Sequence, residues 1–528
     1  MTLSAQSTQN TRSTSIPAAD LRPSGPAKAP WRDWLALALL MFPVLLVAVD
    51  NTALTFALPA IASGLETTGV QLLWIVDAYP LVLAGLLVAM GSLGDRIGRR
   101  RLLLTGSVGF AAVSAATAFA PSAEWLIAGR ALLGFFGAML MPSTLSLIRN
   151  IFPDPNRRRL AVAIWAAGFS GGAALGPIFG GWLVERFWWG AILLVAVPIM
   201  LPLLAFGPAF IPESKDPRPG RADVPSIALS LLVMVPVVYG IKELATEGFG
   251  AAPVGLIAFG LAMAFVFVRR QQRLASPLLD MSLFGNRVFS TAITANVLAL
   301  FSFNGFILFL AQHLQLLDGM TPSSAGIATI PALVATVVAG LAVVPLVRKV
   351  RPGFVVAGGL ALSATGYGLV VFGDHGSGPS LLLAALLILA LGVGTAETIS
   401  NDLILGSVPA EKSGAAAAIS ETGYEVGSLL GTAVLGSILT ASYQRNLRLP
   451  AGVEETASGT AVHQAGETLA GAVELADILP APLAEALRGA ARLAFDSGVH
   501  TTAAIALALM TGAAVLAAVV LRKVPTAD

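Results

Sequence analysis

Cysteine is absent from the 528 residues of this sequence, and histidine is scarce. The lack of cysteine excludes disulfides, thiolate metal sites and cysteine nucleophiles. The histidines are scattered and have no metal-ligand spacing; they are His313, His375, His463 and His500. We therefore expect no metal, no other cofactor and no enzymatic activity.

Charged residues are scarce as well. They make up only 12% of the chain, against 56% hydrophobic residues, whereas an average soluble domain carries about 25% charged residues. So little charge cannot cover a water-soluble surface of this size, and lipid is the expected solvent. The net charge is only +2, so the sequence pI near 9.0 gives no reason to expect a nucleic-acid partner.

A signal peptide and a phosphate-binding loop are also missing. Residues 1–32 are rich in Ser, Thr and Pro, lack an apolar core, and predict a disordered cytoplasmic tail. The string closest to a Walker A motif, Gly406 to Ser413, has Glu411 where the second glycine is required. We therefore expect ion coupling rather than ATP hydrolysis.

Long apolar runs, in contrast, are abundant. A helix needs about 20 mainly apolar residues to cross a bilayer. This criterion predicts fourteen spans, near 34–60, 70–91, 102–120, 124–147, 160–184, 189–211, 224–241, 252–269, 288–311, 324–346, 353–373, 380–404, 413–440 and 501–521. The sequence therefore predicts an all-α polytopic membrane protein.

Basic residues determine the orientation of these spans. Clusters of Arg and Lys follow the second, fourth, sixth, eighth, tenth and last spans, whereas the opposite loops, such as 374–379, carry almost none. After the sixth span the cluster consists of Lys215, Arg218 and Arg221. The positive-inside rule then puts both termini in the cytoplasm. We expect the protein to lie in a bacterial inner membrane.

One segment interrupts the regular alternation of spans and short loops. Residues 443–500 form a long external insert before the last span. Within it, Pro482 to Phe495 has apolar residues at helical spacing, with Arg488 and Arg492 one turn apart. An external helical hairpin that caps the pore and a flexible loop are both compatible with this pattern.

A glycine-rich, charged motif follows the second span. Its key residues are Gly91, Asp95, Arg96, Gly98 and Arg99. Glycines let two helix ends approach closely, and the acid can pair with guanidinium groups or with a helix N-terminus across a domain boundary. The motif resembles the G-x-x-x-D-R-x-G-R signature of the major facilitator superfamily; the alternative is an ordinary basic loop that only sets topology.

The first span contains a second motif. Asp50 with Ala57-Leu58-Pro59 resembles the D-x-T-x-x-N-x-A-L-P signature of the fourteen-span drug:proton antiporters within that superfamily. Thr55 stands where that family usually has asparagine, and Asn51 directly follows Asp50.

Two further motifs agree with this resemblance. In the fourth span, Arg130 with Gly134 resembles the R-x-x-x-G-x-G motif of proton coupling, although the second glycine, Gly137, falls one place late. In the fifth span, the antiporter motif G-x-x-x-G-P-x-x-G-G is matched by Gly172, Gly176, Pro177, Gly180 and Gly181. Small residues at this spacing allow tight helix contact, and the proline bends the helix.

The resemblance covers about residues 33–525 and extends to the QacA-like exporters of quaternary ammonium compounds and dyes, through Trp74 to Tyr79 and Glu421 to Glu425. It implies a six-helix bundle in 33–213, two inserted membrane helices in 214–275 and a second six-helix bundle in 276–528. It also implies alternating access around a central cavity. The implied function is proton-coupled export of lipophilic cationic drugs, dyes and quaternary ammonium compounds.

Acidic residues inside the spans need a reason, because a carboxylate at a helix centre costs about 2.5–3.5 kcal/mol on insertion scales. We expect Asp50, Arg130 and Glu421 to carry proton coupling: the guanidinium favours the charged carboxylate and burial the neutral one, so a conformational change can load and release a proton. The alternative for Asp50 and Arg130 is a static structural pair.

Other acids and rings predict a cation-binding cavity, with Arg130 as the chief base inside the membrane. Different carboxylates can engage different cations, and aromatic rings can add cation–π contacts. The expected substrate-binding residues are Asp77, Glu397, Glu425, Tyr79, Phe306 and Tyr424. For Asp77 the alternative is a side chain that reaches the membrane interface, and for each ring it is packing.

The expected partners are lipophilic cationic small molecules, protons and membrane lipid, with the chain acting as a monomer. A rival function is proton-driven export of an endogenous metabolite, lipid or self-made antibiotic. A more remote rival is a non-transporting membrane sensor. The sequence leaves open which acids bind protons and which bind drug.

Overall fold

Every regular element in the described part of the chain is a helix in this computed structural model. The structure describes residues 30–215, 223–248, 250–274, 277–373, 378–409 and 412–524. The predicted tail up to residue 29, Arg218, Arg221 and residues 374–377 of the loop 374–379 lie outside these residues. The predicted all-α class is confirmed.

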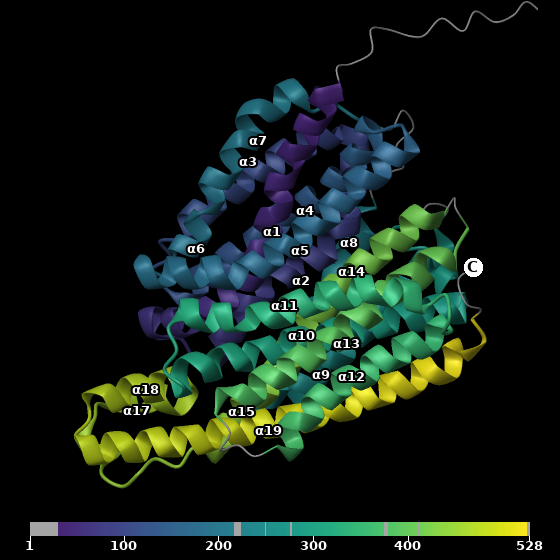
Figure 1. Ribbon diagram of the computed structural model, residues 1–528. Coiled ribbons are helices and arrows are strands. Elements are labelled where there is room, and N and C mark those ends of the chain that lie inside the picture. Colours follow the sequence, from purple (N-terminus) through teal and green to yellow (C-terminus); the bar gives the residue numbers. More distant parts are fainter. Residues whose placement is uncertain are drawn as a thin grey trace, which may run out of the picture.

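The first bundle is built from the N-terminal helices. Within it α1 packs along α5, α2 along α4, and α3 against α4 and α7. The helices are α1 (Pro30–Leu65), α2 (Gly69–Ile97), α3 (Arg99–Thr117), α4 (Ala123–Ile151), α5 (Pro155–Arg186), α6 (Ala191–Leu194) and α7 (Ala196–Phe210). Figure 1 shows this bundle in the upper half of the molecule.

The second bundle lies against the first (Figure 1). Its α12 and α13 pack on each other, and α19 packs along α12. The helices are α10 (Arg287–Gln312), α11 (Pro322–Leu346), α12 (Pro352–Phe372), α13 (Pro379–Gly406), α14 (Ser413–Leu430), the π-helical turn η5 (Gly431–Leu435), α15 (Gly436–Asn446) and α19 (Ala481–Val520). A short 3-10 helix, η1 (Met281–Gly285), precedes α10, and a π-helical turn, η2 (His313–Leu317), follows it.

Local sequence signals explain where several helices begin. Thr68 and Gln71 form a capping box at the start of α2, with each side chain accepting a hydrogen bond from the other residue's backbone N–H. Asp154 and Thr321 cap α5 and α11, and each is followed by a proline at the first helical position. These caps satisfy backbone donors that would otherwise be unpaired at the helix ends.

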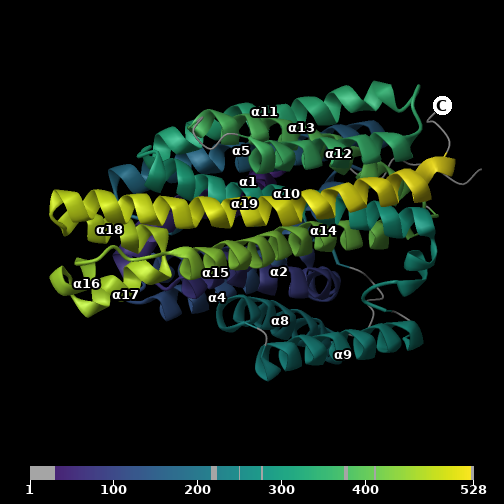
Figure 2. The ribbon, with the colours of Figure 1, turned by 90° about the horizontal axis from the view of Figure 1, so that it is seen from below.

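The inserted helices α8 (Val224–Glu247) and α9 (Ala251–Arg273) pack on each other, and α8 also lies along α2 and α15. Figure 2 shows the pair at one edge of the molecule. Their outer surface is strongly apolar, with Phe259, Leu261 and Phe265 exposed. Such a surface fits a lipid solvent rather than water.

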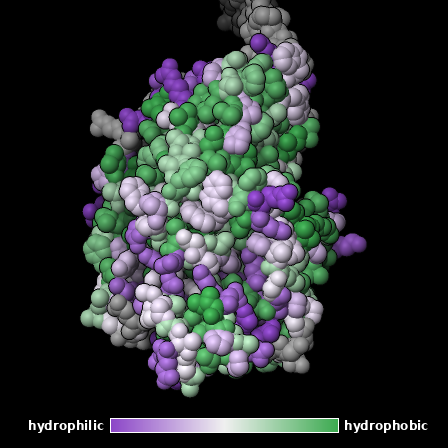
Figure 3. Space-filling view, turned by 90° about the vertical axis from the view of Figure 1, so that its left-hand side faces the viewer, coloured by the Kyte–Doolittle hydropathy of each residue, from purple (hydrophilic) through white to green (hydrophobic). Residues whose placement is uncertain are grey.

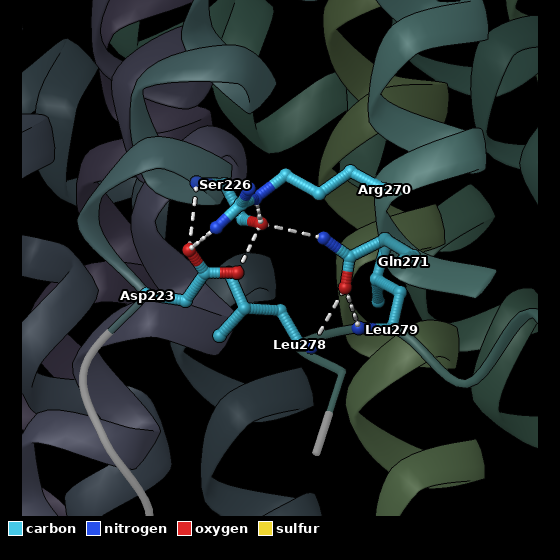
Figure 4. Close-up of polar contacts among 6 residues, drawn as sticks. All are labelled: Asp223, Ser226, Arg270, Gln271, Leu278 and Leu279. Carbon is cyan, nitrogen blue, oxygen red and sulfur yellow. Dashed lines mark hydrogen bonds and ion pairs between the residues drawn. The ribbon is translucent and has the colours of Figure 1, made fainter. Parts of the chain in front are cut away.

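A polar cluster joins the inserted helices to the second bundle (Figure 4). Asp223 caps α8 and pairs with Arg270 of α9 at 2.7 Å, while Gln271 donates to Ser226 at 2.7 Å and accepts from the N–H of Leu278 at 2.8 Å. Partial burial would raise the pKa of Asp223, but the bonds from Arg270 and Ser226 outweigh it and hold that pKa below its usual value. The cluster therefore fixes α8 and α9 to the segment that leads to η1 and α10.

Both ends of the described chain lie on one side of the molecule, which we call the terminal side: α1 begins and α19 ends there (Figure 1). The opposite side carries three short helices between α15 and α19, and we call it the insert side. These helices are α16 (Val453–Thr456), α17 (Gly459–Glu467) and α18 (Leu469–Ile478). Figure 3 looks onto the insert side, where hydrophilic and apolar side chains are interspersed.

The insert is helical, so of the two alternatives for residues 443–500 the structure has the ordered one. Tyr443 of α15 donates to the carbonyl of Ala465 at 2.9 Å, and Gln444 donates to Glu467 at 3.1 Å. The predicted helix Pro482 to Phe495 forms the first part of α19. Since α18 also contacts α1 and η2, the insert touches both bundles.

In the described part of the chain, thirteen helices are long and apolar enough to cross a membrane, against the fourteen predicted. The difference is the span expected at 102–120. It coincides with α3, whose 19 residues begin with three arginines and contain several small polar residues. α3 nevertheless packs inside the first bundle on α4 and α7.

Candidate functional site

Asp50 and Arg130 form a buried ion pair in the first bundle. The Arg130 guanidinium lies 2.7 Å from the Asp50 carboxylate, and the side chains are only 2% and 5% exposed, respectively. Arg130 also donates to the carbonyl of Ile75 at 3.2 Å and lies 4.6 Å from the ring centroid of Tyr79. The pair therefore joins α1, α2 and α4, and the structure brings together the two residues that the sequence predicted for proton coupling.

The glycines of the fourth span support this pair indirectly. A Cβ atom at Gly134 would lie 2.5 Å from the Tyr79 carbonyl, and one at Gly137 would lie 3.1 Å from the Tyr79 hydroxyl. The displaced second glycine thus makes room for the ring that covers Arg130. The Tyr79 hydroxyl is buried and has no hydrogen-bond partner among the described residues.

The glycines of α5 make two kinds of contact. Gly172 and Gly180 pack on α1, where an added Cβ would lie 2.8 Å from Ala48 and 2.7 Å from Ala53. Gly176 faces Thr52 of α1, whose hydroxyl donates to the carbonyl of Ala173 at 3.0 Å. These glycines allow α1 and α5 to approach closely within one bundle.

Gly181 instead contacts the second bundle. An added Cβ there would clash with the Pro322 carbonyl at the start of α11, and one at Gly326 of α11 would clash with the Pro177 carbonyl of α5. A hydroxyl of Ser323 also donates to Glu185. The end of the antiporter motif thus seals the two bundles against each other on the insert side.

The motif after α2 is attached to its own bundle. Gly98 has φ +112°, which favours glycine, and it allows the turn from α2 into α3. Glu213 after α7 accepts the Arg100 backbone N–H at 3.0 Å. Asp95 pairs with Arg99 at 2.6 Å, so the acid bonds a guanidinium of its own loop instead of reaching across the bundle boundary. Arg96 is half-buried in the last turn of α2.

A cavity of about 300 Å³ separates the two bundles on the terminal side. It is lined by residues of α2, α4, α5 and α14, among them Gly91, Asp95, Arg149, Trp165 and Glu421. Of the three residues predicted to couple protons, Glu421 reaches this cavity, whereas Asp50 and Arg130 are buried deeper in the first bundle.

The other predicted glutamates gather around Tyr424 of α14. Its hydroxyl is close enough to interact electrostatically with Glu397 of α13 and with Glu421 and Glu425 of α14. The Tyr424 ring meets Phe169 of α5 edge-on, at 5.9 Å between centroids. An aromatic contact therefore crosses between the bundles beside three carboxyl groups.

Phe306 does not join this cluster. It is fully buried in the core of the second bundle, with ring centroids 4.6 Å from Phe309 and 5.5 Å from Tyr367. Core packing in α10 and α12 accounts for its position, and we leave it out of the substrate site considered below.

Asp77 has a partner that the sequence analysis missed. Lys242 of α8 lies 2.9 Å from its carboxylate, and the side chains are 1% and 0% exposed, respectively. Thr432 of η5 also donates to Asp77, and the Lys242 ammonium lies 3.9 Å from the Trp74 ring centroid. Asp77 is therefore not an interfacial side chain, and Arg130 is not the sole base deep in the membrane helices.

A signal for Lys242 was present in the sequence. The span expected at 224–241 ends one residue before it, and the consecutive charges of Lys242 and Glu243 interrupt the apolar run at that point. In the structure α8 continues to Glu247. Extending the span by one turn would have placed a lysine at the depth of Asp77.

Comparisons with known proteins agree with this architecture. Residues 40–432 match the family model of the Major Facilitator Superfamily. The multidrug efflux pump LfrA of Mycolicibacterium smegmatis is 52% identical over 496 residues, which cover 94% of this chain and 98% of that pump. The methyl viologen resistance protein SmvA of Salmonella typhimurium is 36% identical over 470 residues, covering 88% of this chain and 93% of that protein.

A solved structure shares the fold. It is a bacterial homolog of the human lysosomal transporter Spinster in an inward-facing, unoccupied conformation. The TM-score is 0.67 over 95% of this chain and 100% of that one, at 16% sequence identity. At this identity the likeness concerns the fold alone.

Proposed function

Since this chain belongs to the Major Facilitator Superfamily, we propose that it exports lipophilic cationic drugs, dyes and quaternary ammonium compounds in exchange for protons. It is a multi-pass protein of the bacterial inner membrane and a transporter rather than an enzyme. We further propose that fourteen helices span the membrane, that both termini are cytoplasmic and that the chain acts as a monomer. The terminal side is then cytoplasmic and the insert side external.

The observation that carries the proposal is the group of carboxyls around Tyr424, next to the cavity between the bundles. Glu421 lines that cavity, and Glu397 and Glu425 lie within electrostatic reach of the same ring. Carboxylates in a poorly hydrated site attract cations strongly, and a ring face adds to the attraction. The proposed substrate site therefore consists of Glu397, Glu425 and Tyr424, with Tyr79 at its deep end.

The relatives support the same chemistry. LfrA is named as a multidrug efflux pump and SmvA for resistance to methyl viologen. Methyl viologen is an organic dication, and a group of several carboxyls suits such a charge. Drug export is thus supported by relatives and by the site together.

Proton coupling is assigned to Asp50, Arg130 and Glu421. Asp50 pairs with Arg130 deep in the first bundle, while Glu421 faces the cavity. A proton that neutralises Asp50 weakens its bond to Arg130, and a cation that arrives at the glutamates displaces protons from them. This linkage lets the proton gradient drive cation export.

The contacts between the bundles support alternating access. On the insert side Gly181 and Gly326 allow α5 and α11 to pack tightly, while on the terminal side a cavity separates the bundles. Rocking of the bundles about the central site would exchange these two arrangements. In this state the cavity lies toward the cytoplasm, where a drug would enter.

Ethidium efflux from pump-deficient cells tests the proposal. Cells that express the chain should lose ethidium quickly, and a protonophore or the Asp50→Asn substitution should stop the loss. Asp477→Asn is the matched control, because Asp477 is 62% exposed in the insert and pairs only with a surface arginine in the described part of the chain.

Two outcomes would change the proposal. Efflux that persists in the presence of a protonophore would rule out proton coupling. No efflux of several dyes and quaternary ammonium compounds by well-expressed protein would remove the multidrug function. Export of an endogenous metabolite, lipid or self-made antibiotic would then become the leading alternative.

A further inference from the structure

The buried pair of Asp77 and Lys242 joins three separate parts of the molecule. Asp77 belongs to α2 of the first bundle, Lys242 to the inserted helix α8, and Thr432, the third partner, to η5 of the second bundle. The inserted helices thus supply a charge to the boundary between the bundles, and the proposed transport cycle described above gives this charge no role.

The surroundings of the pair form an apolar seal. Leu81 of α2, Val238 of α8, and Leu429 and Ala433 of the second bundle are buried together, with Trp74 and Met234 packed against them. Most of these residues stand about one helical turn to the terminal side of the pair and separate it from the cavity there, while Trp74 covers the Lys242 ammonium toward the insert side. In such surroundings, separated charges are far less stable than a paired acid and base.

The backbone around Thr432 favours the contact. The helix of α14 widens into the π-helical turn of η5 at residues 431–435, and Gly431 packs closely on Phe301 of α10. Single π-turns are often associated with functional positions in membrane and soluble helices. Here the turn aims the Thr432 hydroxyl at the Asp77 carboxylate.

We propose that Lys242 is a gating residue. Its ammonium stays paired with the Asp77 carboxylate and keeps the insert side closed while the cavity on the terminal side is open. The inference rests on the proposed alternating access. When the bundles separate on the insert side, Asp77 leaves Thr432 and the seal opens around Lys242. The inserted helices therefore set the balance between the two states of the transporter, and Asp77 is a gate acid rather than a substrate ligand in this state.

The natural lack of cysteine makes the test direct, because any introduced cysteine is the sole thiol. Leu73→Cys places a reporter on the insert side, where Leu73 is 5% exposed and packs with Leu58 and Leu308. Ser146→Cys places a second reporter in the lining of the cavity on the terminal side. Right-side-out membrane vesicles are treated with a membrane-impermeant maleimide for the first reporter, and inverted vesicles for the second.

Lys242→Met should raise the labelling rate of the Leu73→Cys reporter about tenfold, equivalent to ~1.4 kcal/mol in the equilibrium between the two states. Labelling of the Ser146→Cys reporter should fall, because the molecule spends less time open on the terminal side. Lys242→Arg should keep both rates, since it preserves the charge. Lys349→Met is the matched control, because Lys349 is exposed at the end of α11.

Three results would contradict the proposed gating role of Lys242. Unchanged labelling of both reporters would mean that Lys242 does not lock the insert side. Faster labelling of both would indicate local unfolding. An equal change in the Lys349→Met control would indicate a general effect of charge loss. Labelling needs no transported substrate, so an exporter that proves to carry another class of compound would leave this result valid.

Discussion

Two buried ion pairs in the described part of this transporter have similar geometry but connect different parts of the molecule. Asp50 and Arg130 lie on α1 and α4 of the same bundle, 2.7 Å apart. Asp77 and Lys242 lie 2.9 Å apart on α2 and an inserted helix, and share a hydroxyl of the second bundle. A pair inside one bundle can change protonation while the helices stay in place, whereas a pair at the boundary must rearrange when the bundles move.

The glycines of α5 show the same division. Gly176 meets Thr52 inside the first bundle, whereas Gly181, little more than one turn later, meets Pro322 of the second bundle. One short motif thus serves both the stability of a bundle and the closing of the insert side. A substitution at Gly176 should therefore change stability, whereas one at Gly181 should change the balance between the two conformations.

The largest effect is expected for Asp50→Asn. The substitution leaves the Arg130 guanidinium buried without its counter-charge, which typically costs about 3–5 kcal/mol of stability. We expect loss of proton-driven efflux and a lower unfolding temperature of the protein in detergent, measured together on the same preparation. Asp50→Glu should retain more stability. Asparagine-variant vesicles that still export dye under an imposed pH gradient would contradict the assignment.

The next largest effects are expected for Gly176→Val and Gly181→Val, which should differ in kind. Overpacking inside a bundle costs about 1–3 kcal/mol, so Gly176→Val should lower the free energy of unfolding. Gly181→Val should instead keep the unfolding temperature and raise labelling of the Leu73→Cys reporter, because the clash lies between the bundles. Equal losses of stability in both variants would mean that contacts within a bundle and contacts between the bundles contribute alike to stability.

A smaller effect is expected for Thr432→Val, which removes one hydrogen bond to Asp77 but keeps the ion pair. Hydrogen bonds between membrane helices contribute on average ~0.6 kcal/mol, so labelling of the Leu73→Cys reporter should increase by a factor of about two to three. Thr432→Ser retains the hydroxyl and is the control. If Thr432→Val increased the labelling rate as much as Lys242→Met, the Thr432 hydroxyl rather than Lys242 would keep the insert side closed.

The smallest effect is expected at the surface cluster of α8 and α9. Arg270→Gln removes a partly exposed ion pair, for which up to about 1 kcal/mol is typical. The ion pair holds the pKa of Asp223 below its usual value in the folded protein, so the contribution is fully present above the pKa of the unfolded chain and is lost as the pH falls through the lower folded pKa. Hydrogen exchange of the first turn of α8 should thus be faster in the variant at pH 7, with the difference vanishing in strong acid.

The sequence predicted the within-bundle features better than those at the boundary. The pairing of Asp50 with Arg130 could be predicted, because each stands alone in an apolar run and a buried charge requires a partner. Thr432 donates to a residue 355 positions away in the chain, and no local pattern connects the two. The position of Phe306 could not be predicted for a similar reason, since only the packing of α12 on α10 determines that its ring meets Tyr367.

The helix α19 extends well beyond what a membrane crossing requires. With a rise of about 1.5 Å per residue, its 40 residues form a rod of about 60 Å, against a hydrocarbon thickness of about 30 Å. The outer half of this rod carries the insert and continues without interruption into the second bundle. An antibody fragment bound to the outer half of α19 would therefore turn with that bundle, and its tilt in electron micrographs would report the angle between the bundles in each state.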